Sequence, residues 1–74
     1  MKYLEELNSG SIISIDNKRY IISNDFRLKN KQKQRMCISI ENGLINWFGD
    51  NSIVEHIDLY YRDYDGNILP LNKN

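Results

Sequence analysis

"RMCISIENGLINWF", residues 35–48, is the segment from which the fold can be inferred. Two apolar-rich runs stand on either side of Asn42-Gly43, and both contain the β-branched and aromatic residues that are common in strands. Asn-Gly favours a tight turn, because both residues tolerate the positive φ angles that such a turn needs. The segment therefore predicts an antiparallel β-hairpin.

Two more pairs of apolar runs flank turn residues elsewhere in the chain. "SIISI" and "RYIIS" flank residues 16–18, and "HIDLYYRDY" and "NILPL" flank Asp65-Gly66. Pro70 has no amide hydrogen to donate, so the last strand is expected to lie at an edge or to end there. Short strands at this spacing predict a mainly β fold, a small SH3-like or OB-like antiparallel barrel of five or six strands.

The first residues have a different pattern. "KYLEELNSG" predicts a short helix with Tyr3, Leu4 and Leu7 on one face. Two helical turns are not stable alone in water, so this helix is expected to cover one open end of the barrel. The chain then forms a single domain over residues 1–74, with the helix at 1–9, the barrel at 10–71 and a tail at 72–74.

Alternation along the strands assigns their faces, because successive side chains point to opposite sides of a sheet. Cys37, Phe48, Tyr60 and Tyr64 are expected to face outward. The residues expected to form the core are Met36, Ile38, Ile40, Ile45, Trp47, Ile57, Leu59 and Tyr61.

The chain has 74 residues, and a domain of this length buries only about 60% of the surface that its unfolded form exposes. Its single cysteine excludes an internal disulfide, so self-association is the stabilising device that remains. We expect a homo-oligomer with contacts near Pro70 or the N-terminal helix. The lone cysteine, the lack of a leader pattern and the lack of a long apolar run predict a cytoplasmic protein.

The net charge is zero, but the charges are unevenly distributed. Residues 18–35 hold seven cations and one acid, a balance of plus six, whereas residues 36–74 have a balance of minus four. An asymmetry of this kind can orient a charged ligand or a neighbouring copy.

Candidates for chemistry are few, and we expect no catalytic residue, no metal site and no cofactor. Cys37 and His56 could pair as nucleophile and base, but no motif surrounds the cysteine, which is expected to be a plain strand thiol. Glu55, His56 and Asp58 alternate in direction along a strand and do not converge on a metal. "YYRDYDG" lacks the terminal glutamate of a calcium loop, so its aspartates are expected to be turn residues.

Binding has more support, from "FRLKNKQKQRM", residues 26–36, in which a cation stands at every second position. The segment lies between two predicted strands and is either a loop or the extended ends of both strands. If it is extended, its five cations share one face and form a comb suited to phosphates. Outward rings could stack on bases. The predicted ligand-binding residues are Phe26, Arg27, Lys29, Lys31, Lys33, Arg35, Phe48, Tyr60, Arg62 and Tyr64.

"LNSGSIISIDNKRYIIS" followed by "CISIENGLINWF" resembles the small barrel-type accessory proteins of bacteriophages with AT-rich hosts. The likeness covers residues 7–59 and rests on a glycine-led strand, a hairpin and an "NG" turn. Several such groups inhibit bacterial antiviral systems, so the resemblance implies an antagonist of host defence.

Three functions remain open. The first is a non-catalytic antagonist that sequesters a nucleotide-derived immune signal, with cations for the phosphates and rings for the bases. The second is an inhibitor or adaptor that docks on an acidic host protein. The third is a single-strand nucleic-acid binder, against which zero net charge counts, because polyanion affinity comes mostly from an excess of cations.

Overall fold

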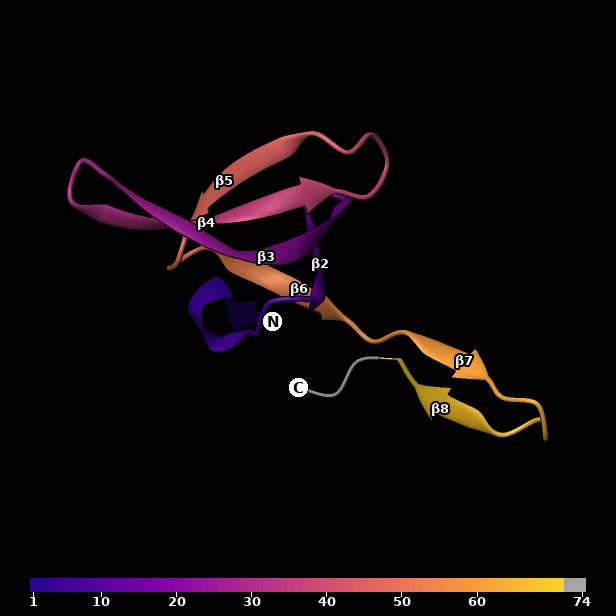
Figure 1. Ribbon diagram of the computed structural model, residues 1–74. Helices are drawn as coiled ribbons and strands as arrows, with labels where there is room; N and C mark the ends of the chain where they lie inside the picture. Colours follow the sequence, from indigo (N-terminus) through magenta and orange to yellow (C-terminus); the bar gives the residue numbers. More distant parts are fainter. Residues whose placement is uncertain (72–74) are drawn as a thin grey trace.

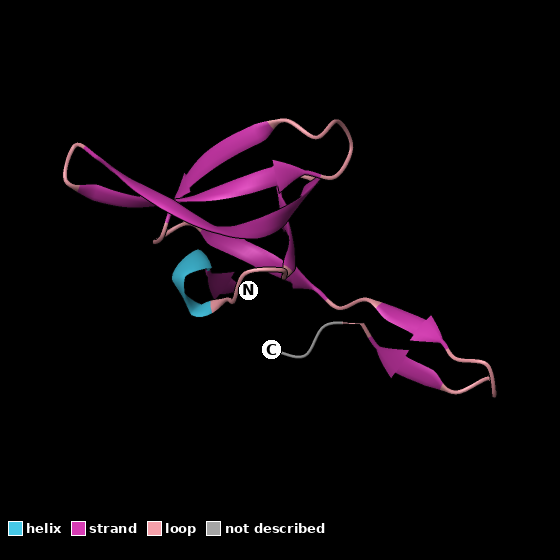
Figure 2. Cartoon of the chain, viewed as in Figure 1, coloured by secondary structure: helices cyan, strands magenta, loops and turns pink. Residues whose placement is uncertain are grey.

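The computed structural model describes residues 1–71, so the expected tail at 72–74 lies outside the described residues. Antiparallel strands are the main elements of the chain (Figure 1 and Figure 2). Six strands form one sheet in the order β1-β6-β2-β3-β4-β5, and β7 and β8 form a separate pair. The mainly β prediction is confirmed. The elements are β1 Lys2–Tyr3, the 3-10 turn η1 Leu4–Glu6, β2 Ile12–Ile15, β3 Lys18–Lys29, β4 Gln32–Ser39, β5 Ile45–Gly49, β6 Ile53–Ile57, β7 Tyr60–Arg62 and β8 Ile68–Pro70.

All three predicted hairpins are present. Asp16 and Asn17 join β2 to β3 with φ angles of 51° and 63°. The loop between β4 and β5 contains Gly43 at φ 73°, and the turn between β7 and β8 contains Gly66 at φ 86°. These positive φ angles explain why the turns carry glycine, asparagine and aspartate.

The expected N-terminal helix over residues 1–9 is replaced by the short strand β1 and the single turn η1. The backbone amide of Leu4 donates to the Ser52 carbonyl at 2.9 Å, and that of Glu5 donates to the Asp50 carbonyl at 3.0 Å. These bonds tie the segment to the loop between β5 and β6. Tertiary hydrogen bonds and the burial of Leu4 and Leu7 therefore hold it, since a helix this short has little stability of its own.

The sheet is open, so the expected closure into a barrel is not confirmed. The sheet runs from β1 at one edge to β5 at the other, and these edge strands do not pair with each other. The predicted long strand "HIDLYYRDY" is divided, because β6 ends at Ile57 and β7 begins at Tyr60. The C-terminal strands thus leave the sheet and cannot close it (Figure 1).

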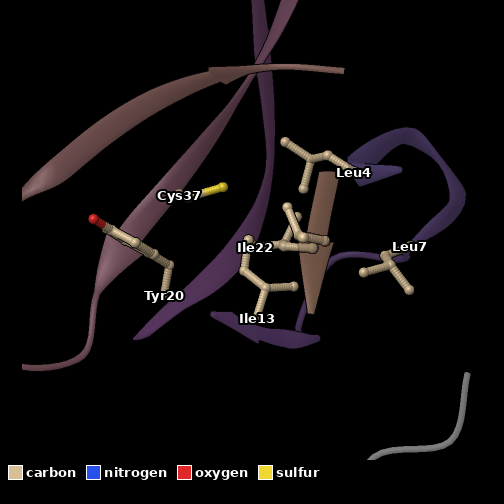
Figure 3. Packing of buried hydrophobic residues seen from close by; sticks show 7 residues of the cluster. Leu4, Leu7, Ile13, Tyr20, Ile22 and Cys37 are labelled. Carbon is tan, nitrogen blue, oxygen red and sulfur yellow. The ribbon is translucent and has the colours of Figure 1, made fainter. Parts of the chain in front are cut away.

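A small core lies on one face of the sheet, around residues of β2, β3, β4, β6 and the N-terminal segment (Figure 3). Ile15 and Phe48 pack against it. The buried hydrophobic residues are Leu4, Leu7, Ile13, Tyr20, Ile22, Cys37 and Val54.

The core face of β4 is the opposite of the predicted one. Cys37 and Ser39 are buried, whereas Ile38 is only half-buried and Ile40 is exposed. The ladder explains the reversal, because Ser39 lies beside Tyr20 and Cys37 beside Ile22. Two small residues fit beside two large ones, a size match that alternation of apolar and polar residues does not reveal.

The molecule is elongated, with principal extents of 51 × 25 × 21 Å. The turn between β3 and β4 lies at one end and the β7–β8 hairpin at the other (Figure 1). Within residues 1–71, no helix is both long and apolar enough to cross a bilayer.

Candidate binding site on the basic hairpin

The basic segment forms a projecting ribbon, which we call the basic hairpin and define as residues 26–35 (Figure 1). It consists of the end of β3, a two-residue turn at Asn30 and Lys31, and the start of β4. Both turn residues have positive φ, 52° and 65°, as a type I′ turn requires. The sequence allowed either a loop or extended strand ends for this segment, and the structure has extended strand ends.

The turn divides the cations between two faces. Cross-strand partners share a face of a ladder, and Lys29 pairs with Gln32 while Leu28 pairs with Lys33. Odd-numbered residues of β3 therefore face the same side as even-numbered residues of β4. The predicted comb of five cations on one face is corrected: Arg27 and Lys29 lie on one face, Lys31 lies in the turn, and Lys33 and Arg35 lie on the opposite face.

One face is polar and basic. Its Arg27 Nε donates a hydrogen bond to Gln34 Oε1 at 2.9 Å, and the Arg27 Cζ lies 4.5 Å from the ring centroid of Trp47 on β5. Stacking and hydrogen bonding hold this guanidinium in place. Sequence reasoning placed Trp47 in the core and missed this contact, for which local spacing offers no signal. We call the four residues of this surface the polar-basic face: Arg27, Lys29, Gln32 and Gln34.

The other face combines apolar and basic side chains. Phe26 is 58% exposed and Leu28 is 74% exposed, and Lys33 Nζ lies 4.4 Å from the Phe26 ring centroid. Arg35 is half-buried, and its Nε is buried without a hydrogen-bond acceptor among the described residues. Surfaces that join an aromatic ring to an arginine are typical of binding interfaces. We call these four residues the apolar-basic face: Phe26, Leu28, Lys33 and Arg35.

Phe48 does not belong to this exposed surface, although it was predicted to face outward. Its ring packs edge-on against Tyr20, with centroids 5.0 Å apart and planes at 74°. It lies beside Arg35 in the ladder and packs against the core. The β4–β5 register places Phe48 on the same side as buried Cys37, which explains the correction.

The three remaining predicted residues lie on the β7–β8 hairpin, residues 60–70, which we call the arm. Tyr60 pairs with Pro70 at the start of β7, Arg62 pairs with Ile68 at the end of β7, and Tyr64 lies in the turn that follows. All three are exposed. The arm and the basic hairpin are at opposite ends of the molecule (Figure 1), so a small ligand cannot contact both.

The catalytic candidates are apart. Cys37 lies on β4 and His56 on β6, two strands that β2 and β3 separate in the sheet. Burial raises the pKa of the Cys37 thiol to about 11, although the charge of Arg35 acts in the opposite direction. His56 Nδ1 lies 3.5 Å from Asp58 Oδ1. Among residues 1–71, no three His, Cys, Asp or Glu side chains gather as a metal site requires.

Asp63 is a turn residue, as predicted. Its Oδ1 accepts hydrogen bonds from the backbone amides of Asn67 at 2.9 Å and Asp65 at 3.0 Å. The amide of Asn67 is the main cause of a lowered pKa for this carboxyl group. The carboxylate therefore stabilises the turn of the arm.

A hollow of about 330 Å³ lies beside the basic hairpin. It contains one cation, Lys33, and two carboxylates, Glu5 and Asp50, and no aromatic ring lines it. This hollow offers neither the charge nor the stacking surface that a nucleotide needs.

Comparison with known proteins adds no constraint to this geometry. No protein family matches the chain, and searches of curated proteins and of solved structures find no match.

Proposed function

We propose that this protein is a non-catalytic binding protein whose basic hairpin docks on an acidic surface of a partner protein. The observation that carries the proposal is the apolar-basic face. Its exposed Phe26 and Leu28 offer apolar area along a projecting ribbon, and Arg35 and Lys33 are their partners on the neighbouring strand. Interface centres are enriched in aromatic residues and arginine, and charges at their margins steer association with partners of opposite charge.

Sequestration of a nucleotide signal, the first function considered from the sequence, has less support. It needs cations and exposed rings around one pocket, whereas the Phe48 ring is half-buried against Tyr20, Tyr60 and Tyr64 lie on the arm, and the hollow beside the hairpin is acidic. A ribbon that projects from the molecule is better suited to a surface than to enclosing a small molecule.

The polar-basic face favours a second candidate, the groove of a nucleic-acid duplex. A two-stranded ribbon fits the major groove of B-form DNA, and cations on both faces of such a ribbon could approach phosphates on both walls. Leu28, 74% exposed near the tip, finds no favourable contact with phosphates, which is why we rank this candidate second.

The biological setting that we propose is antagonism of antiviral defence in the cytoplasm of a bacterial host. Its support is the resemblance of residues 7–59 to small phage accessory proteins. The partner would then be an acidic host defence protein.

Binding can be tested by fluorescence anisotropy with three labelled probes: a peptide of alternating glutamate and leucine, a short DNA duplex and a cyclic dinucleotide. We expect the peptide to bind most tightly and its affinity to fall with salt. Phe26→Ser with Leu28→Ser should weaken peptide binding tenfold or more, since interface anchors typically contribute more than about 1 kcal/mol each. Lys29→Ser with Lys31→Ser and Lys33→Ser should reduce both affinity and salt dependence.

A control variant removes three exposed cations outside the hairpin, through Lys2→Ser, Lys18→Ser and Arg62→Ser. It has the same net charge as the three-lysine hairpin variant, so equal binding by the two would show that only net charge matters. Tight duplex binding that depends on Lys29 but not on Phe26 would support the nucleic-acid candidate. Preference for the cyclic dinucleotide would restore the nucleotide function.

A further inference from the structure

The face of the sheet opposite the core carries a continuous row of isoleucines. Five neighbouring strands each contribute one isoleucine, and ladder pairing aligns each with the next. The alternate positions, Ile13, Ile22 and Cys37, are buried in the core, so the row faces the other way. From β6 to β5 this isoleucine row consists of Ile57, Ile12, Ile21, Ile38 and Ile45.

This row is an unusual solvent face for an antiparallel sheet. Such sheets commonly pair a buried apolar face with a polar one. Here Ile45 is 58% exposed and Ile21 is 37% exposed, and Met36 and Trp47 extend the apolar surface on the same face. Contiguous apolar surface of this kind marks an interaction site.

Charged groups stand at the margins of the row. On one side, Ser14 of β2 is flanked by Glu55 and Arg19, and Arg19 pairs with Glu41 at 3.2 Å. On the other side, Arg27 lies over Trp47. An apolar centre with a polar rim is the usual anatomy of a protein interface.

The exposed surface of the chain is larger than its mass predicts. Its accessible surface is 5647 Å², whereas a compact monomer of 8.8 kDa exposes about 4,800 Å². The excess of roughly 850 Å² is shared among the row, the arm and the basic hairpin, and a standard interface buries ~800 Å² on each partner. Its radius of gyration, 13.6 Å, also exceeds the ~11 Å expected for a chain of this length.

We propose that a second copy of this chain covers the isoleucine row, with the two sheets packed face to face about a twofold axis. A twofold interface uses the same patch on both copies, and a row of identical side chains across a sheet can pack against itself. Within residues 1–71, the core of one copy holds seven buried hydrophobic residues, so a shared second core would add the burial that a small domain lacks. The dimer leaves the apolar-basic face of each basic hairpin free, because that face lies on the opposite side of the sheet from the row.

Sedimentation equilibrium of the full chain from micromolar to about 100 μM tests the proposal, with circular dichroism as the check on folding. We expect twice the 8.8 kDa mass of one chain. Ile21→Asp and Ile45→Asp should each raise the dimer dissociation constant at least a hundredfold while the variants stay folded, since both positions are exposed in the monomer. The control is Ile68→Asp on the arm, where the isoleucine is 65% exposed, and it should leave the dimer intact.

Chemical crosslinking provides a second test of the interface, which does not depend on the folding of the aspartate variants. Ile21→Cys and Ile68→Cys, each combined with Cys37→Ala, are treated with a bifunctional maleimide. Covalent dimer from the Ile21→Cys protein alone supports the row as the interface. A monomeric wild-type chain at 100 μM, a dimer that survives aspartate at Ile21 and Ile45, or dissociation by Ile68→Asp would each overturn the proposal.

Discussion

Cys37 is the residue for which the sequence offered two interpretations, a nucleophile or a small hydrophobic side chain. It is fully buried beside Ile22, and its thiol has a pKa raised to about 11. The thiolate is the reactive form of cysteine, and at neutral pH very little of this side chain is ionised. The geometry therefore favours a packing role.

The raised pKa of Cys37 predicts a loss of stability at alkaline pH. The folded thiol keeps its proton between the ordinary value of 9.0 and about 11, a range in which the unfolded thiol loses it. The contribution of the protonated thiol to the free energy of unfolding is complete below pH 9 and declines as the pH rises toward 11. Urea unfolding should show wild type losing more stability over this range than Cys37→Ala, by on the order of 2 kcal/mol. Equal losses in the two proteins would contradict the prediction.

At the level of elements, the three hairpins could be predicted because turn chemistry is local. Asp16-Asn17, Asn42-Gly43 and Asp65-Gly66 each tolerate positive φ, and each lies in the connection of an observed hairpin. The N-terminal segment could not be predicted in this way, because hydrogen bonds to Asp50 and Ser52 decide its conformation. Such bonds join segments far apart in sequence.

The candidate site could be predicted in composition but not in arrangement. The basic segment was identified, yet its division into two faces depends on the turn at Asn30 and Lys31. Alternation also could not say which face of β4 is buried, because isoleucines occupy one face while small residues, Cys37 and Ser39, occupy the other. The small residues of β4 are the buried ones because they lie beside large side chains, Tyr20 and Ile22, on the neighbouring strand.

The turn of the basic hairpin supplies a prediction about stability. Lys31 has φ 65°, a left-handed conformation that costs a residue with a Cβ atom roughly 1–2 kcal/mol. Lys31→Gly creates the Asn-Gly pair preferred in type I′ turns and removes this conformational cost. Glycine also has greater backbone freedom in the unfolded chain, which offsets about 0.5–1 kcal/mol of the stability gained. We expect a net stabilisation of about 0.5–1 kcal/mol by chemical denaturation.

Lys31→Ala is the matched control, since it removes the same charge and keeps the Cβ atom. It should leave stability near that of the wild type. If Lys31→Ala stabilises the protein as much as Lys31→Gly does, charge repulsion in the hairpin, and not backbone strain at residue 31, is what destabilises the wild type.

On the scale of the whole molecule, charge and shape are linked. The basic hairpin projects from one end of the sheet, and the arm, with Asp63 and Asp65 in its turn region, projects from the other (Figure 1). In the proposed dimer, the apolar-basic face of each basic hairpin stays accessible while the opposite faces of the two sheets meet. Two basic hairpins on one particle would strengthen binding to a repetitive partner through avidity.

The arm is expected to be dispensable for the fold of the sheet. Among residues 1–71, every buried hydrophobic residue lies between Leu4 and Val54, and the strands of the arm pair with each other and not with the six-stranded sheet. An isolated two-stranded hairpin is marginally stable in water. Removing residues 60–74 should therefore change the thermal midpoint by no more than a few degrees, and in the full chain the arm amides should exchange hydrogen much faster than those of β2 and β3.

Leu4→Ala provides the contrast, because emptying a fully buried site typically costs about 2–5 kcal/mol. Its midpoint should fall well below that of the truncated chain. The truncated chain should also remain dimeric, since the isoleucine row ends at Ile57 and is intact. If truncation unfolds the sheet, the arm stabilises it through contacts beyond its own ladder. If truncation yields a folded monomer, the arm forms part of the interface and the row alone does not suffice.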